Sequence, residues 1–181
     1  MVNNESGLYF GTKFLPVKFV QLSAYSDFYK SEWFNFTTAG PSRGWDIFTQ
    51  VEFVFSSRFE FYLRFKNEIK EQKFIMEERY VNLPEKIQRT RLHFHFKPSQ
   101  QLSFKTRFEH ALYKGIKKEN GFMIFQDVQL NPNSLPLNFS ARLAWFKTGG
   151  YDSRIYAYEN DLLYTFSIPA FFGKGFRTYL N

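Results

Sequence analysis

Two histidines and two acidic residues have the types and spacing that could perform chemistry. His93 and His95 are one residue apart, so on a strand both imidazoles point to the same face, as in metal sites built on β-sheets. Their neighbours are Arg and Lys, which repel a cation, so we expect no metal. Glu159 and Asp161 could form a catalytic carboxylate pair, but pairing with an arginine such as Arg142 explains them more simply.

No catalytic or cofactor-binding motif accompanies these residues. The sequence has no nucleophile elbow, no glycine-rich phosphate loop and no His-Glu-x-x-His motif. Gly173-Lys174-Gly175 lacks the upstream glycine and the following Ser or Thr of a phosphate-binding loop, so it indicates a turn. We therefore expect no catalytic residue, no cofactor and no enzymatic activity.

The elements that position these side chains are strands with strict alternation. From Arg58 to Lys66 every second residue is large and apolar, and most residues between them are charged; the pattern returns at 91–97 and 102–109. Successive strand side chains point to opposite faces, so each strand has one apolar and one ionic face. Transmembrane β-barrels repeat this arrangement on every strand, with apolar side chains toward lipid and polar ones toward the lumen.

The sequence therefore predicts an all-β fold, an antiparallel transmembrane β-barrel of the outer-membrane type with about ten strands. Turn residues place the strands at 7–15, 17–29, 46–56, 58–70, 87–97, 101–113, 121–131, 136–147, 153–167 and 174–181. Short connections at 15–16, 56–57, 98–100 and 132–135 alternate with longer ones at 30–45, 71–86, 114–120 and 148–152. Short periplasmic turns and longer extracellular loops are typical of such barrels. For 71–86 we expect a plain loop, with a short helix as the alternative.

The ionic face supplies the residues that would line the lumen. They are Glu60, Arg64, Arg91, His93, His95, Arg107, Glu109, Arg142, Glu159 and Asp161. Charges in a narrow lumen need partners, so we expect an ion-pair ladder across neighbouring strands that holds the barrel together; a polar conduit or binding surface is the functional alternative. A soluble lipocalin-like barrel would place the apolar face inward, but so many Phe and Leu side chains would overfill it.

Composition agrees with membrane-crossing strands. Aromatic residues make up 22% of the 181 residues, yet the mean hydropathy is negative, because apolar residues alternate with polar ones. No apolar stretch approaches the ~20 residues of a membrane-spanning helix. The lack of cysteine permits an oxidising compartment without proving one. The net charge of +7 is spread over every expected strand and loop, so we expect no nucleic-acid partner.

The ends of the chain predict that it is a single-domain fragment of a larger barrel. Residues 1–5 lack the charged and apolar regions of an export signal, and residues 179–181 fall inside an expected strand. The expected partners are the lipid bilayer of the bacterial outer membrane and other parts of the same parent chain.

A resemblance points the same way. Tyr151–Tyr164 and Phe166–Arg177 resemble the late barrel region of large Bacteroidota outer-membrane proteins that are labelled helix-hairpin-helix domain-containing proteins. Leu8–Gly11 and Phe59–Arg64 are similar to earlier strands of that barrel. In that family the helix-hairpin-helix part lies near the N-terminus, and no such helices are evident here, so the resemblance implies no DNA binding by these residues.

The resemblance implies an outer-membrane location but carries no established activity. We therefore expect a membrane anchor or a polar conduit. The alternative is an outer-membrane enzyme with its site at the mouth of the lumen, for which Glu159, Asp161 and His95 are the candidate residues.

Overall fold

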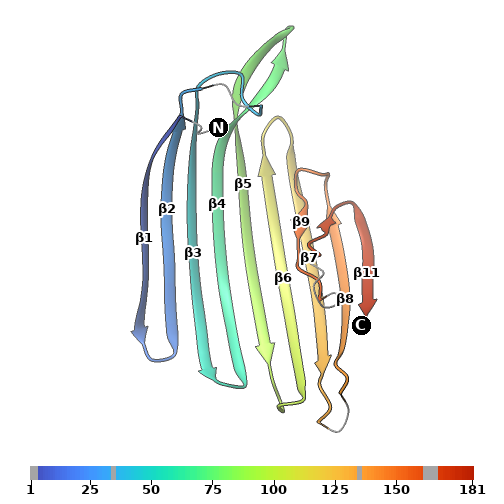
Figure 1. Ribbon diagram of the computed structural model, residues 1–181. Coiled ribbons are helices and arrows are strands. Elements are labelled where there is room, and N and C mark those ends of the chain that lie inside the picture. Colours follow the sequence, from blue (N-terminus) through green and yellow to red (C-terminus); the bar gives the residue numbers. More distant parts are fainter. Residues whose placement is uncertain (1–3, 34–35, 134–135, 161–166) are drawn as a thin grey trace.

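The chain folds into one large antiparallel β-sheet (Figure 1). The computed structural model describes residues 4–33, 36–133, 136–160 and 167–181, and these contain strands and turns but no helix. Nine strands form the sheet in the order β1-β2-β3-β4-β5-β6-β7-β8-β11, and β9 pairs with β10 outside it. Their bounds are β1 Glu5–Val17, β2 Val20–Ser31, β3 Ser42–Ser56, β4 Phe59–Met76, β5 Arg79–Phe96, β6 Leu102–Lys114, β7 Lys118–Leu130, β8 Phe139–Thr148, β9 Ile155–Tyr156, β10 Ala170–Phe171 and β11 Lys174–Leu180. The expected all-β antiparallel fold is confirmed.

The predicted strand at 153–167 is wrong in its described part. Only Ile155–Tyr156 form a strand there, as β9, Glu159 and Ser167 form an isolated bridge, and residues 161–166 lie outside the described residues. Ile155 and Ala157 are almost wholly inaccessible to solvent, because the chain turns back after β8 and lays them against the sheet. Alternating apolar residues therefore serve here to cover a face, and not to extend the sheet.

The predicted loop at 71–86 is also wrong, since β4 and β5 continue through it as a long hairpin. Its tip, Glu77–Glu78, has φ values of 47° and 64°, which are the positive values of a type I′ turn. The tip rises above the rest of the sheet in Figure 1. The β6–β7 connection is likewise short, at residues 115–117, where a longer loop was expected.

One face of the sheet is apolar, and we call it the apolar face. Directly opposed residues form an unbroken apolar row across all nine strands of the sheet, namely Phe14, Leu22, Val51, Leu63, Leu92, Phe108, Ile124, Trp145 and Phe176. A second row adds aromatic contacts, with Phe53 stacked on Phe61 at 4.5 Å between ring centroids and Phe61 on Phe94 at 5.7 Å. The alternation in the sequence thus becomes a continuous apolar surface.

The sheet is open in the described residues. β1 pairs only with β2, and β11 pairs only with β8, so the outer backbone edge of each end strand has no strand beside it in the described part of the chain. The strands lie in the sheet in the same order as in the chain, apart from β9 and β10, which are left out of it. This arrangement is a meander.

Candidate functional site

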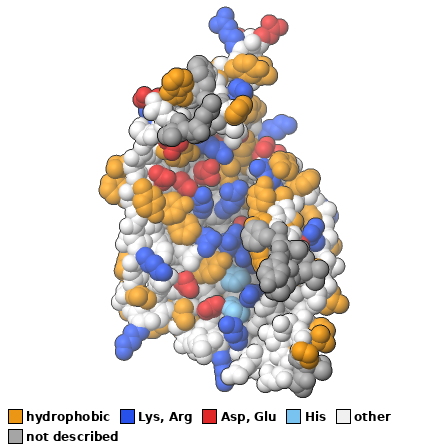
Figure 2. Space-filling view, viewed as in Figure 1, with side chains coloured by type: hydrophobic (Ala, Val, Ile, Leu, Met, Phe, Trp, Pro, Cys, Tyr) orange, Lys and Arg blue, Asp and Glu red, His pale blue; other side chains and the backbone are white. Residues whose placement is uncertain are grey.

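The opposite face of the sheet is ionic, and we call it the ionic face. The register places the following predicted residues on it, each opposite another member of the same face: Glu60, Arg64, Arg91, His93, His95, Arg107, Glu109 and Arg142. Figure 2 shows this face, with acidic side chains gathered toward the top and Lys and Arg through the middle. Glu159 reaches the same face from the β8–β11 connection, and Asp161 lies outside the described residues.

Part of the expected ion-pair ladder is present. Arg91 and Glu109 form a two-pronged pair, with Nε and Nη2 donating to the two carboxylate oxygens at 2.7 and 3.0 Å. Glu60 meets His95 Nδ1 at 2.7 Å. Arg64 faces Arg91 directly but donates to Gln50 Oε1 at 2.8 Å instead, and its guanidinium lies 5.3 Å from the Phe48 ring centroid.

Other members of the ladder have no acidic partner in the described part of the chain. Arg107 lies over the Phe125 ring, 4.9 Å from its centroid, and its buried Nε makes no hydrogen bond to described residues. Nδ1 of His93 is also buried and makes no hydrogen bond to described residues, and the His93 ring stacks on Tyr62. The described residues contain no group of three or more His, Cys, Asp or Glu side chains that could hold a metal ion.

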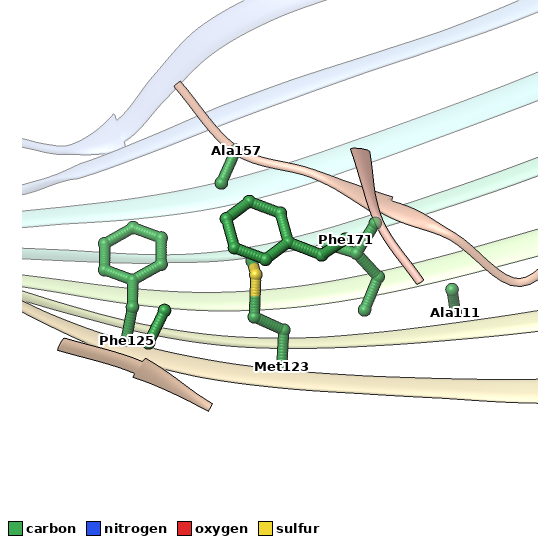
Figure 3. Close-up of a cluster of buried hydrophobic side chains, with 7 residues drawn as sticks. Ala111, Met123, Phe125, Ala157 and Phe171 are labelled. Atoms are coloured by element: carbon green, nitrogen blue, oxygen red, sulfur yellow. The ribbon is translucent and has the colours of Figure 1, made fainter. Parts of the chain in front are cut away.

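The β8–β11 connection lies across the ionic face, and its described residues, 149–160 and 167–173, are here called the covering segment. Its Ile155, Ala157 and Phe171 are at most 2% exposed. They pack with four residues of the sheet, Ala111, Met123, Phe125 and Ala144 (Figure 3). This is the buried hydrophobic cluster of the described residues, and burial of each large side chain in it stabilises docking by roughly 1.5–3 kcal/mol.

A close backbone approach seats the covering segment on β7. A Cβ atom on Gly121 would lie 2.2 Å from the carbonyl oxygen of Ser153, a distance that only glycine permits. Ser153 N donates to Glu119 Oε2 at 3.2 Å beside this contact. Arg154 Nε donates to the Tyr156 hydroxyl at 2.7 Å, and this hydrogen bond lowers the pKa of Tyr156.

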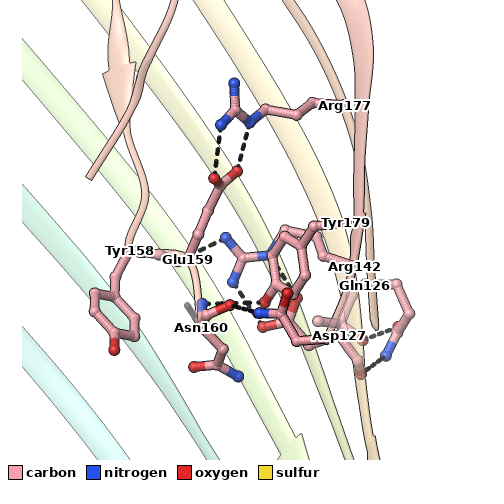
Figure 4. Close-up of polar contacts among 10 residues, drawn as sticks. Gln126, Asp127, Arg142, Tyr158, Glu159, Asn160, Arg177 and Tyr179 are labelled. Carbon is pink, nitrogen blue, oxygen red and sulfur yellow. Dashed lines mark hydrogen bonds and ion pairs between the residues drawn. The ribbon is translucent and has the colours of Figure 1, made fainter. Parts of the chain in front are cut away.

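Arginines fix the far end of the covering segment (Figure 4). Arg142 donates to both oxygens of Asp127, at 2.5 and 2.7 Å, and its Nη1 donates to the carbonyl oxygen of Tyr158 at 2.6 Å. Arg177 of β11 pairs with Glu159 at 2.7 and 2.8 Å. Glu159 thus pairs with an arginine as expected, but the arginine is Arg177 and the example of Arg142 is wrong, because the strand register puts Asp127 directly opposite Arg142.

Several important residues were absent from the predicted set. Asp127 and Arg177 complete the two ion pairs, and Met123, Phe125 and Phe171 form the buried cluster. Met123 and Phe125 did carry a signal, since they place large apolar side chains at positions of β7 whose alternation belongs to the ionic face. Such a break in alternation indicates that something covers the ionic face at that point.

The covering segment keeps part of the ionic face away from water, so the charges there lie in a region of low dielectric constant. The side chains of Arg142 and Asp127 are 4% and 5% exposed, so their charges are removed from water together.

Comparison with family models, with curated proteins and with solved structures finds no match to this chain. Among the described residues, no helix has the length and apolar character needed to cross a membrane.

Proposed function

We propose that this chain forms part of the wall of an outer-membrane β-barrel, with the apolar face toward lipid and the ionic face toward a polar lumen. It acts there as a membrane anchor or as a polar conduit. The observation that carries the proposal is the apolar row from Phe14 on β1 to Phe176 on β11, which is backed on every strand by a polar or covered face. A soluble monomer seldom exposes an apolar surface of this extent.

The strand lengths support the proposal. β1 to β7 contain 12 to 18 residues each, whereas a tilted strand needs only ~9–11 residues to cross a bilayer. The apolar row crosses β6 and β7 at their middle and lies nearer one end of β2 and β4, where Leu22 is the third of 12 residues and Leu63 the fifth of 18. The longer strands thus have residues to spare outside the hydrocarbon, as at the β4–β5 tip.

The position of the covering segment argues against a soluble barrel with its apolar face inward. Ile155 and Phe171 pack on the ionic face, and the opposite face keeps side chains such as Leu63 and Leu143 about half exposed. If the ionic face lines a lumen, the covering segment narrows that lumen beside β7 and β8. The conduit is then a restricted one, lined by Arg64, Arg91 and Arg107.

The two free edges of the sheet need partners in a bilayer. Each unpaired backbone group in hydrocarbon costs several kcal/mol, so β1 and β11 must pair with further strands, or with the edges of other copies when this chain is refolded alone. The proposed source is another part of the same parent chain, in keeping with the resemblance of Tyr151–Arg177 to Bacteroidota outer-membrane barrels.

Lipid contact of the apolar face tests the proposal. Trp145 lies in the apolar row, and Trp33 lies outside the strands with 64% of its surface exposed. Variants that keep only Trp145 (W33F/W45F) or only Trp33 (W45F/W145F) are refolded into phosphatidylcholine vesicles with brominated acyl chains. We expect bromine to quench Trp145 strongly and Trp33 weakly. Quenching of Trp145 by aqueous acrylamide, with none by brominated lipid, would refute lipid contact.

A further inference from the structure

The charges on the apolar face are confined to one border. On the described strands, its Lys, Arg, Asp and Glu side chains all lie at the end of the sheet that carries the β4–β5 tip, and His110 lies below them. They are Lys30, Arg43, Glu71, Lys73, Lys86, Lys114, Lys118, Lys147 and Lys174. Glu71 is the single acid among them. Below this border the apolar face of the described strands has neither Lys, Arg, Asp nor Glu.

Five of these lysines face one another directly, and we call them the lysine border. Lys86 of β5 is opposite Lys114 of β6, which is also opposite Lys118 of β7; Lys147 of β8 is opposite Lys174 of β11. Like charges directly opposite on one face of a sheet destabilise it. No salt bridge joins these five lysines to an acidic residue of the described chain, and Lys114, Lys118, Lys147 and Lys174 are exposed. The repulsion calls for an external anion.

Apolar side chains lie one step below three lysines of the lysine border on the same face, and Gln88 and Asn120 lie one step below the other two, Lys86 and Lys118. Leu112 is two residues from Lys114, Trp145 two residues from Lys147, and Phe176 two residues from Lys174. A partner that fits both levels has an anionic head and an apolar tail. Lysine side chains are long and flexible, so their ammonium groups can reach the polar layer beyond these apolar side chains.

The same two-level arrangement continues on the first strands. A groove there has Leu8, Phe28, Trp45 and Ile69 in its apolar part, and Lys30, Arg43 and Glu71 at its rim, where Arg43 N donates to Glu71 Oε2 at 2.9 Å. Glu32 lies 2.8 Å from Lys30 and partly neutralises its charge. The hydrogen bond that Lys30 donates lowers the pKa of the Glu32 carboxyl group. An acyl chain fits the apolar part of such a groove, and a headgroup fits its rim.

We infer that the lysine border binds the phosphate-bearing headgroups of the membrane leaflet at the β4–β5 end of the sheet. This inference rests on the proposed membrane function. The anion is a lipid phosphate rather than a nucleic acid, because the lysines share one face with the apolar row and stand two to six residues from it on the same five strands. A nucleic acid would use the charges without the apolar side chains beneath them.

Vesicle binding by matched variants tests the inference. The full chain, K86Q/K114Q/K118Q and the control K13Q/K70Q/K105Q are refolded in detergent and transferred to vesicles of phosphatidylcholine, alone or mixed with phosphatidylglycerol. The control removes the same number of lysines from the ionic face, where Lys13, Lys70 and Lys105 lie. Partition coefficients are measured by flotation at low and high salt, with RNA added in a parallel series.

The lysine-border variant is expected to lose the preference for phosphatidylglycerol, and the control to keep it. One lysine near an anionic surface is worth roughly a fivefold change in partitioning, so three should reduce binding at least tenfold at low salt. Equal losses in the two variants, equal binding to both vesicles by the unsubstituted chain, or displacement of the vesicles by RNA overturns the inference. Failure of the unsubstituted chain to bind either vesicle overturns the membrane proposal as well.

Discussion

Removal of the Arg142 guanidinium should destabilise the protein strongly, because it leaves a buried carboxylate without a partner. The pair with Asp127 has two hydrogen bonds, at 2.5 and 2.7 Å, and the two side chains are 4% and 5% exposed. An uncompensated buried charge typically costs about 3–5 kcal/mol. We therefore expect R142M to lower the free energy of unfolding by about that amount.

The double variant D127L/R142M separates the loss of the pair from the exposure of one charge. Both charges are then gone, and replacement of a buried pair by apolar residues is often nearly neutral. We expect the double variant to be more stable than R142M by at least about 2 kcal/mol, which is a large coupling between the two sites. Urea unfolding in detergent micelles, followed by tryptophan fluorescence, measures each free energy.

An exposed ion pair provides the control. Lys30 and Glu32 approach within 2.8 Å, but their side chains are 45% and 54% exposed. K30M should therefore leave stability nearly unchanged. If R142M changes stability as little as K30M does, water reaches the Arg142–Asp127 pair in the folded protein, and the covering segment does not shield it. That result would refute the account of the ionic face given above.

Two further substitutions examine the covering segment and the long hairpin. Gly121→Ala places a Cβ atom 2.2 Å from the Ser153 carbonyl oxygen, so it should displace the covering segment and speed tryptic cleavage after Arg154; Gly40→Ala, with nothing within 4 Å of its Cβ, should not. Unchanged cleavage in both would contradict the close approach. Replacement of Glu77–Glu78, with φ values of 47° and 64°, by Asn-Gly should relieve about 1–3 kcal/mol of backbone strain per residue at most and slow amide exchange in the hairpin. Faster exchange would argue against the type I′ turn.

Alternation alone was enough to assign most side chains to a face. Side chains alternate between the two faces of a strand, so odd and even positions belong to opposite faces. Phe61 and Arg64 could therefore be assigned to opposite faces without knowledge of the strand pairing. The face and the antiparallel order follow from periodicity and short turns. Whether the sheet forms a membrane barrel does not follow from its strands, and it stays a prediction.

Pairing partners were harder to predict, because they depend on register. On charge alone Arg142 could pair with Glu159 or Asp127, and the β7–β8 register selects Asp127. The hairpin tip at Glu77–Glu78 was missed for another reason. Asn or Gly is the usual indication of a type I′ turn, and two glutamates held at positive φ by the long β4–β5 ladder carry no such sequence signal.

The connection of the covering segment to adjacent strands sets a limit on what can compete with it. Lys147 and Lys174 pair directly, and Thr148 N donates to the Gly173 carbonyl oxygen at 2.6 Å, so both ends of the segment are held side by side. The entropy of closing this loop is spent whether the segment is docked or displaced, so its contacts alone decide between the two states. A loop tethered in this way presents itself to the ionic face at an effective concentration on the order of millimolar. A soluble molecule that binds the same part of the ionic face must overcome that intramolecular competitor, whereas a single lost contact in the segment lowers the threshold for every competitor at once.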